Sequence, residues 1–338
     1  MSRIKHLQLV LPQLLTQLRS TQSLQTWPVL HQWLQQGARQ RLWAADDLQH
    51  ARLDPWQQAL LQTLPVALRE HGLASAALQW RGEGGAWPKG SCLHAEWVHF
   101  AAGLDDLRLV LPPAPSVDEQ AQLLASVQPL LALAGFDLQP SPAGHPQHWY
   151  LSSNQPLKVT SYSPRAGFAT RVYDTLPQGA DGAALRRLMT EVQMLLHEHP
   201  VNQQRASRGV PALNAMWLWG AAPLQLVTQQ TMQRMLSNEP YVQGLAEHLH
   251  LDCWPLPAEG RALLSVDAEQ VLLVLPNDVH TSLDVQWFEP IHQALLRGEI
   301  ETLDVYLDHW RVTLRGGRWQ QLRRNWSTLP LQLDEFLA

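Results

Sequence analysis

The stretch from His197 to Gly220 constrains the fold of this chain more than any other part of the sequence. It combines two prolines, two asparagines, two arginines and two closely spaced tryptophans, and it ends in glycine. Residues 183–196, just before it, place their apolar side chains on one face of a helix. Because proline cannot continue a helix, we expect this helix to end before Pro200.

Three side chains of this stretch have the chemistry of an anion-binding site. Arginine offers a fork of donors, asparagine an amide and histidine a proton, so His199, Asn202 and Arg205 form a candidate set. The alternative is a loop after the helix that is tied down by side-chain hydrogen bonds to its own backbone. The residue types alone favour this second interpretation.

The end of the stretch has the alternation of a strand. If residues 217–219 are extended, Trp217 and Trp219 share one face, where they either line a groove or pack in the core. Core packing is the favoured interpretation, because most tryptophans are buried. We expect Asn214 to fix the turn before this strand, since an asparagine amide imitates backbone groups.

Patterns in the first half of the chain predict several further elements. The apolar run 7–11 indicates a buried strand or a helix start, and residues 27–73 have helical spacing. The alternating runs 95–100 and 107–111 predict a hairpin. A helix is expected after Ser116 and another strand near 149–151. This order predicts a small α+β layer, with a helix on one face of an antiparallel sheet.

The second half of the chain alternates helical and strand-like segments. Helices are expected over 224–236, 241–250 and 287–296, a buried strand over 271–275, and a closing hairpin over 303–307 and 311–314. The fold class predicted for the whole chain is therefore α/β. We expect three parts, which either stay distinct or pack as one compact unit: a mainly helical region 1–90, an α+β subdomain 91–160 and an α/β region 161–338.

Composition excludes several classes of protein. Hydrophobic residues make up 45% and charged residues 16%, which is a globular composition with a sizeable core. The net charge of −5 argues against sequence-independent nucleic-acid binding. Cys92 and Cys253 lack metal-ligand spacing, as expected in a reducing compartment. No apolar run reaches the length of a membrane span, so we expect a soluble cytoplasmic protein without nucleic-acid or membrane partners.

Two acid–histidine pairs are weak candidates for metal ligands. Asp278 and His280 follow the expected strand 271–275, at the end where open α/β sheets place ligands. Asp308 and His309 form the second pair, and a hydrogen-bonded loop is the alternative for both. Four other histidines are interpreted as scattered and without ligand spacing: His94, His99, His145 and His148.

The central stretch resembles the archaeal type of cofactor-independent phosphoglycerate mutase, which belongs to the alkaline-phosphatase-like superfamily. The resemblance is carried by His199-Pro200-Val201-Asn202, Arg205, Gly209, Pro211, Asn214 and Trp217-Leu218-Trp219-Gly220, with Leu176-Pro177, Gly179 and Leu188-Met189 upstream. It implies an altered, shortened version of the mutase fold. It also implies a ligand-binding role for these residues: His199, Asn202, Arg205, Asn214, Trp217, Trp219 and Gly220.

The whole chain also resembles a bacterial group known as regulatory protein RpfE. The shared features are the LVLP start, the strands Ala95–His99 and Trp149–Leu151, the central stretch, and the tail Arg323–Trp326. This second resemblance implies a regulatory role.

The chain departs from the mutase pattern where that family holds its metals. Those enzymes need two divalent ions and a phosphorylated serine, and their first strand ends in Asp-Gly, whereas here Leu11 is followed by Pro12. No serine has the expected early context, and Asp278-Val279-His280 has a different spacing. Because losing several ligands abolishes two-metal chemistry, we expect a non-catalytic regulatory or binding protein without a cofactor. Its expected partner is an anionic, phosphorylated metabolite or a protein.

Two alternatives stay open at this stage. A metal-dependent mutase-like phosphotransferase would use Mn²⁺ or Mg²⁺ and would bring at least three of the four weak metal candidates together. A structural subunit of a larger assembly would expose an apolar patch rich in tryptophan.

Overall fold

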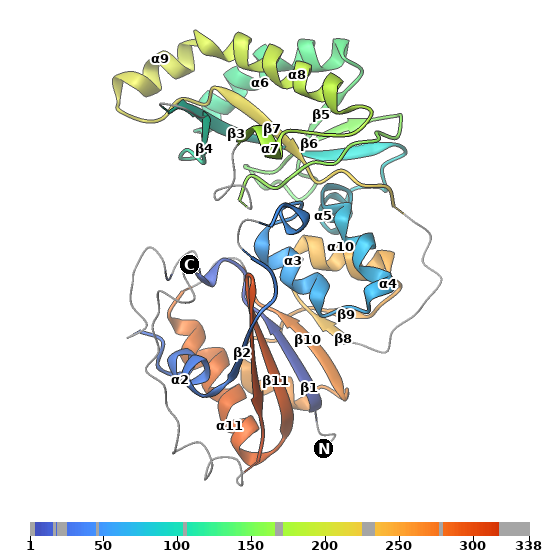
Figure 1. Cartoon of the computed structure of the whole chain (residues 1–338), viewed down its shortest axis with the longest axis vertical. Helices are drawn as coiled ribbons and strands as arrows, with labels where there is room; N and C mark the ends of the chain where they lie inside the picture. Colours follow the sequence, from blue (N-terminus) through green and yellow to red (C-terminus); the bar gives the residue numbers. More distant parts are fainter. Residues whose placement is uncertain are drawn as a thin grey trace. The chain divides into compact units, whose positions relative to one another are not determined.

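The computed structural model describes residues 4–15, 18, 26–44, 47–103, 107–165, 172–224, 234–276 and 280–317. It is a mixed α/β structure, which confirms the predicted fold class, and it divides into two compact units (Figure 1). Unit 1 comprises Met1–Ala45, Pro55–Arg69 and Val227–Ala338, and unit 2 comprises Asp46–Asp54 and Glu70–Leu226.

Unit 1 is built on a seven-stranded sheet in the order β2-β12-β11-β1-β10-β8-β9. The strands are β1 (Ile4–Val10), β2 (Ala38–Arg41), β8 (Arg234–Leu236), β9 (Cys253–Trp254), β10 (Gln270–Val274), β11 (Ile300–Leu307) and β12 (Trp310–Arg315). The central strand β1 pairs in parallel with β10 and β11. Central parallel strands are buried on both faces, and this is why the apolar runs near residues 7 and 271 were readable in the sequence.

Helices complete the core of unit 1. They are α2 (Pro28–Gln36), α3 (Pro55–Gln62), α4 (Val66–Arg69), α10 (Pro240–His248) and α11 (Glu289–Arg297), with a 3-10 segment Gly260–Ser265 and a π-helical segment Asp284–Phe288. The helix α11 ends at Gly298 in the left-handed conformation (φ 75°), which glycine adopts without strain.

Unit 2 contains a five-stranded antiparallel sheet. Its strands are β3 (Ser91–Ala102), β4 (Leu107–Val110), β5 (Asp137–Pro140), β6 (Trp149–Ser153) and β7 (Ala215–Trp219). The long strand β3 pairs with β4, β6 and β7 along different parts of its length. The predicted hairpin of β3 and β4 is confirmed, as are the strand near 149–151 and the helix after Ser116.

The helices of unit 2 are α5 (Ser75–Gly82), α6 (Val117–Leu133), α7 (Val172–Thr175), α8 (Gly182–His197) and α9 (Pro200–Ser207), with 3-10 turns at Leu48–His50 and Glu70–Leu73. Figure 1 shows α6, α8 and α9 along one face of the sheet. Buried side chains of α6 and α8, including Leu123, Val127, Leu188 and Val192, share one hydrophobic cluster with residues of β7. Among the described residues, no helix is long and apolar enough to cross a membrane.

The two compact units combine distant parts of the chain, because β1 pairs with β10 and β11, and β7 pairs with β3. The division into 1–90, 91–160 and 161–338 stays a prediction. Two other sequence-based expectations differ from this structure. The expected helix 224–236 is wrong at residues 234–236, which form β8; residues 225–233 lie outside the described part. The helical spacing expected over 27–73 is wrong at Ala38–Arg41, which form β2; the sequence ARQR of this strand is mostly exposed and has no apolar alternation.

One long-range contact in unit 1 fixes the start of α2. The backbone N–H groups of Val29 and Leu30 each donate to a different carboxylate oxygen of Asp284, both at 3.1 Å. Asp284 is buried, and Trp27, the residue before the helix, provides no side-chain cap. A distant carboxylate therefore takes the place of the usual local N-cap, and its negative charge suits this end of the helix.

We predict that Asp284→Ala lowers the free energy of unfolding of unit 1 by about 1–3 kcal/mol, because two buried N–H donors lose their acceptor. Amide hydrogen exchange at Val29 and Leu30 should accelerate in the same variant. The exposed neighbour provides the control, since Val285→Ala should leave both measurements unchanged. Unchanged exchange at both amides in Asp284→Ala would contradict the capping role.

Candidate functional site

The central stretch forms a junction between two helices of unit 2. The helix α8 ends at His197, His199 occupies the N-cap of α9, and Pro200 is its first residue. The predicted end of the first helix is confirmed, but a second helix follows where a loop was the favoured interpretation. The backbone angle of proline suits the first turn of a helix, where its missing N–H is not needed.

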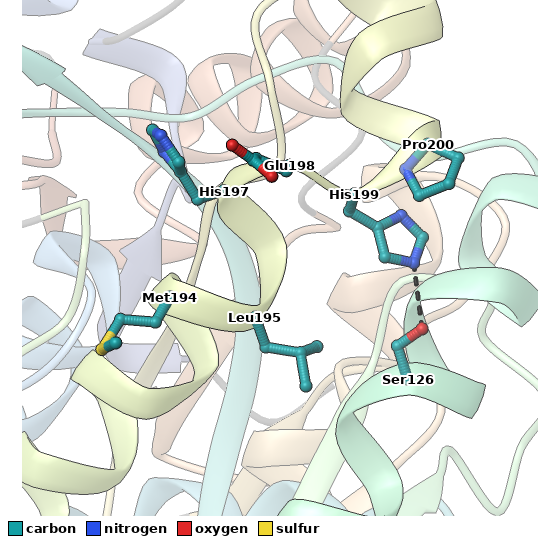
Figure 2. Close-up of a pocket in the computed structure, with 7 residues that line it drawn as sticks. All are labelled: Ser126, Met194, Leu195, His197, Glu198, His199 and Pro200. Atoms are coloured by element: carbon teal, nitrogen blue, oxygen red, sulfur yellow. Dashed lines mark hydrogen bonds between the residues drawn. The ribbon is translucent and has the colours of Figure 1, made fainter.

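His199 holds this junction through both ring nitrogens. Its Nδ1 accepts a hydrogen bond from the N–H of Val201 at 3.2 Å. Its Nε2 lies 3.0 Å from the Ser126 hydroxyl, which donates to the carbonyl of Gln122 (Figure 2). These roles require a neutral imidazole with its proton on Nε2. Burial lowers the pKa of His199 and so favours this neutral form.

Asn202 connects the end of α8 to the segment that precedes β7. Its Nδ2 donates to the carbonyls of Leu196 (2.9 Å) and Leu213 (3.1 Å), and its Oδ1 accepts from the N–H of Leu213 at 2.7 Å. The side chain is buried, so these protein groups account for its amide.

Arg205 is buried, with 2% of its surface exposed, and its three nitrogens all donate to protein acceptors. They contact the carbonyl of Pro211 (2.9 Å), the carbonyl of Pro113 (2.8 Å) and the carboxylate of Glu119 (3.0 Å). Burial opposes ionisation of Glu119, but the Ser116 amide, Arg208 and Arg205 together lower its pKa. The arginine thus belongs to a buried ion pair between α9 and α6.

The strand β7 and the residue before it are part of the core. Asn214 accepts from the N–H of Phe100 (2.8 Å) and donates to its carbonyl (3.0 Å), as a neighbouring strand would. Trp217 and Trp219 are almost fully buried, and their indole nitrogens donate to the Tyr162 carbonyl and to Glu96, both at 2.7 Å. These contacts give the two tryptophans a packing role.

Gly220 closes the stretch for two steric reasons. Its φ of 80° lies in the left-handed region, which glycine adopts without strain. A Cβ added here would lie 2.8 Å from the ring of His94 and 2.9 Å from the Ser75 hydroxyl. His94 packs behind this glycine, 4.4 Å from the Trp219 ring and 3.0 Å from Ser75 Oγ. Burial lowers the pKa of His94 to about 3.

Sequence reasoning missed a group of charged side chains next to Trp219. Arg165 binds Glu96 through two hydrogen bonds of 3.0 and 2.9 Å, and Asp54 lies 3.7 Å from the same guanidinium. The attraction of Glu96 raises the pKa of Arg165, and burial raises that of Asp54. A single acid within the apolar run 95–98 was the available signal for Glu96. Nothing in the local pattern pointed to Arg165 or Asp54.

A surface pocket of about 540 Å³ lies beside the helix junction. Its lining residues come from α6, α8 and the start of α9: Ser126, Met194, Leu195, His197, Glu198, His199 and Pro200 (Figure 2). Met194 and Leu195 are 74% and 40% exposed, so the pocket has an accessible apolar side. His197 and Glu198 supply its most polar groups.

The weak metal candidates lie in unit 1. Ser282 hydrogen-bonds the ring of His280, while Asp308 and His309 form the buried turn between β11 and β12. Asp278 lies outside the described residues. Within the described part, none of His280, Asp308 and His309 belongs to a group of three potential metal ligands. The convergence required by the phosphotransferase alternative is not formed by these three side chains.

The structural-subunit alternative required an exposed patch rich in tryptophan. Among the described tryptophans only Trp254 is exposed, and the guanidinium of Arg234 lies 4.2 Å from the centre of its ring. The described surface therefore gives this alternative no support.

No family model matches the chain, but comparison with known proteins finds a local similarity to a phosphoglycerate mutase. Over 52 residues, or 15% of the chain, it is 44% identical to the 2,3-bisphosphoglycerate-independent phosphoglycerate mutase of Methanothrix thermoacetophila, and the match spans 13% of that mutase. Among solved structures it is similar to a cofactor-independent phosphoglycerate mutase from Thermoplasma acidophilum, with 14% identity, a TM-score of 0.38, and coverage of 93% of this chain and 90% of the other. A protein from Pyrococcus horikoshii gives 14% identity, a TM-score of 0.40, and coverage of 94% and 88%. The resemblance to the RpfE group stays a prediction.

The buried ion pair yields a prediction with an internal control, because Arg205 and Arg208 bind the same carboxylate. Arg205→Ala should lower the free energy of unfolding by about 3–5 kcal/mol, since Glu119 and two carbonyls lose a buried partner. Arg208 is 57% exposed, and Arg208→Ala should cost less than about 1 kcal/mol. Urea unfolding of both variants measures the difference, and equal losses would contradict the structural role of Arg205.

His94 yields a prediction about pH. Its pKa is lowered in the folded chain to about 3, so between pH 6.5 and 3 the unfolded chain binds the extra proton. The free energy of unfolding should therefore fall by roughly 1 kcal/mol for each pH unit below 6.5. His94→Gln should reduce this slope in urea unfolding between pH 6.5 and 4.5, whereas His250→Asn, at an exposed histidine, should retain it. If the free energy of unfolding of His94→Gln falls with pH as steeply as that of the unmodified chain, other groups cause the acid sensitivity.

Proposed function

We propose that this protein is a non-catalytic, regulatory binding protein and that its ligand is a small phosphorylated acid. The non-catalytic part of this proposal rests on one observation: the polar side chains of the central stretch bind other groups of the protein. Arg205 and Asn202 are its best anion-binding side chains, yet they direct their donors at protein carbonyls and at Glu119. Catalysis of phosphoryl transfer needs such donors aimed at the reacting group.

The pocket beside the α8–α9 junction supports the binding part of the proposal. Its volume of about 540 Å³ lies within the range of small-molecule sites. Its lining combines apolar walls from Met194, Leu195 and Pro200 with polar groups from His197 and Ser126. The similarity to a phosphoglycerate mutase over 52 residues suggests the chemical class of the ligand.

The charges around the pocket predict where the phosphate group of the ligand binds. The first turn of α9 begins at Pro200 and carries the positive end of its helix dipole. His197 is exposed on the same rim and offers ring donors to a phosphate. Glu198 is the one acid of the lining, and its carboxylate repels an anion. The phosphate is therefore expected next to His197 or the start of α9, where the neighbouring carboxylate of Glu198 opposes its binding.

We predict opposite effects for two neighbouring substitutions when 3-phosphoglycerate is titrated into the full chain in a calorimeter. His197→Ala should weaken binding several-fold because it removes a donor. Glu198→Gln should strengthen it up to about fivefold, since an exposed charge interaction contributes up to about 1 kcal/mol. Glu191→Gln is the matched control, because this exposed acid of α8 lies outside the pocket lining, and it should bind like the unmodified chain.

Two results would contradict this proposed function. Equal affinities of all three variants for 3-phosphoglycerate would show that the ligand does not bind in this pocket. Turnover of phosphoglycerate by the purified chain in the presence of Mn²⁺, lost in His199→Ala, would show an enzyme. Absence of any stabilisation by phosphorylated acids in a thermal-shift assay would instead favour a protein partner, because a true ligand stabilises the folded state by mass action.

A further inference from the structure

Three potential metal ligands meet in unit 2, and none of them lines the pocket described above. Glu83 follows the end of α5, and His145 and His148 lie in the turn between β5 and β6. One ligand atom from each residue lies within 4.8 Å of the other two. We propose that Glu83, His145 and His148 form a binding site for a divalent transition-metal ion of the zinc type.

The two histidines are already positioned by the backbone. The N–H of His148 donates to the carbonyl of His145 at 3.2 Å, which closes the turn and places the two rings 4.9 Å apart. The Nδ1 of His148 lies 2.6 Å from Oε1 of Glu83. The amide of Gln79 contacts both partners, at 3.2 Å from His148 and 3.3 Å from Glu83. Contacts of this kind orient the ligands of metal sites.

A second observation points to a missing ligand at the same carboxylate. The side chain of Glu83 has no exposed surface, and its other oxygen, Oε2, is buried and accepts no well-aligned hydrogen bond. Burial opposes ionisation of this carboxyl, but His148 and the nearby Ser141 and Tyr150 hydroxyls together lower its pKa. Unsatisfied buried oxygens are rare, and a buried carboxylate with an unsatisfied oxygen is costly. A divalent cation next to Glu83 would offset this cost, because it supplies positive charge to the carboxylate.

The donor set indicates which ions fit. Two imidazoles and one carboxylate are a ligand set of open zinc sites, in which water or an external ligand takes the fourth position. Mg²⁺ and Ca²⁺ prefer oxygen ligands, so they should bind here much more weakly. His145 is exposed and His148 is 38% exposed, which leaves the site open to an ion from solution.

Binding requires one local rearrangement. A zinc ion bonds to nitrogen and oxygen at about 2.0–2.2 Å, so the hydrogen-bonded atoms of His148 and Glu83 must move apart to roughly 3 Å. The Nδ1 atom that binds the metal carries no proton, so the neutral imidazole of His148 holds its proton on Nε2 in the complex. The partly exposed ring of His148 has room for this movement, while the buried Glu83 stays in place.

The sequence contained part of this signal. His145 and His148 have a His-x-x-His spacing that was interpreted as scattered, because no third ligand is near them in the chain. Folding brings Glu83 to them from the end of α5.

The test is a titration of the full chain, without an affinity tag, with Zn²⁺ and with Co²⁺. Calorimetry should show one Zn²⁺ per chain, and Co²⁺ should give the visible absorption of a low-coordinate nitrogen–oxygen site. His145→Ala should weaken binding at least tenfold without affecting the fold, because this side chain is exposed. Glu83→Gln should do the same, with circular dichroism confirming that the variant is folded.

A matched control separates this site from adventitious binding by surface histidines. His250 is exposed in unit 1 with φ 55°, a conformation that asparagine accepts, so His250→Asn should bind Zn²⁺ like the unmodified chain. Equal Zn²⁺ affinity in His145→Ala and the unmodified chain would overturn the proposal. Binding of Mg²⁺ as tight as that of Zn²⁺ would overturn it as well.

Discussion

The buried pair of Arg205 and Glu119 is the interaction on which the architecture of unit 2 depends. Glu119 closes the capping box of α6 through Ser116 and binds the arginine of α9. Arg205 in turn holds the carbonyls of Pro113 and Pro211 on either side. Removing one partner leaves a charge in a low-dielectric environment, which proteins tolerate poorly. This stretch of unusual residues is therefore primarily a structural connection between helices and strand.

The second structural set surrounds the end of β7. Trp219, His94 and Gly220 fit together so closely that only glycine can occupy position 220. Trp219 then donates to Glu96, which is held by Arg165. These buried polar groups are stable because each has a hydrogen-bond partner. Burial also keeps His94 neutral, because it disfavours the charged imidazolium.

The proposed ligand pocket and the proposed metal site are built from different elements. The pocket depends on the junction of α8 and α9, where the polar side chains of the central stretch mainly hold the backbone. The metal site depends on α5 and the turn between β5 and β6. Since the two sites share no residues, an experiment that disproves one proposal does not disprove the other.

The sequence by itself determined the local elements: the apolar face of α8, the helix after Ser116, the hairpin of β3 and β4, and the buried strand β10. Each follows from residues within a few positions of one another. Only the tertiary structure decided that Arg205 meets Glu119, that Asp284 caps α2, and that Glu83 joins two histidines. Periodicity reveals which face of an element is apolar, but it carries no information on which distant segment packs there. The chemistry of each candidate site depends on that second choice.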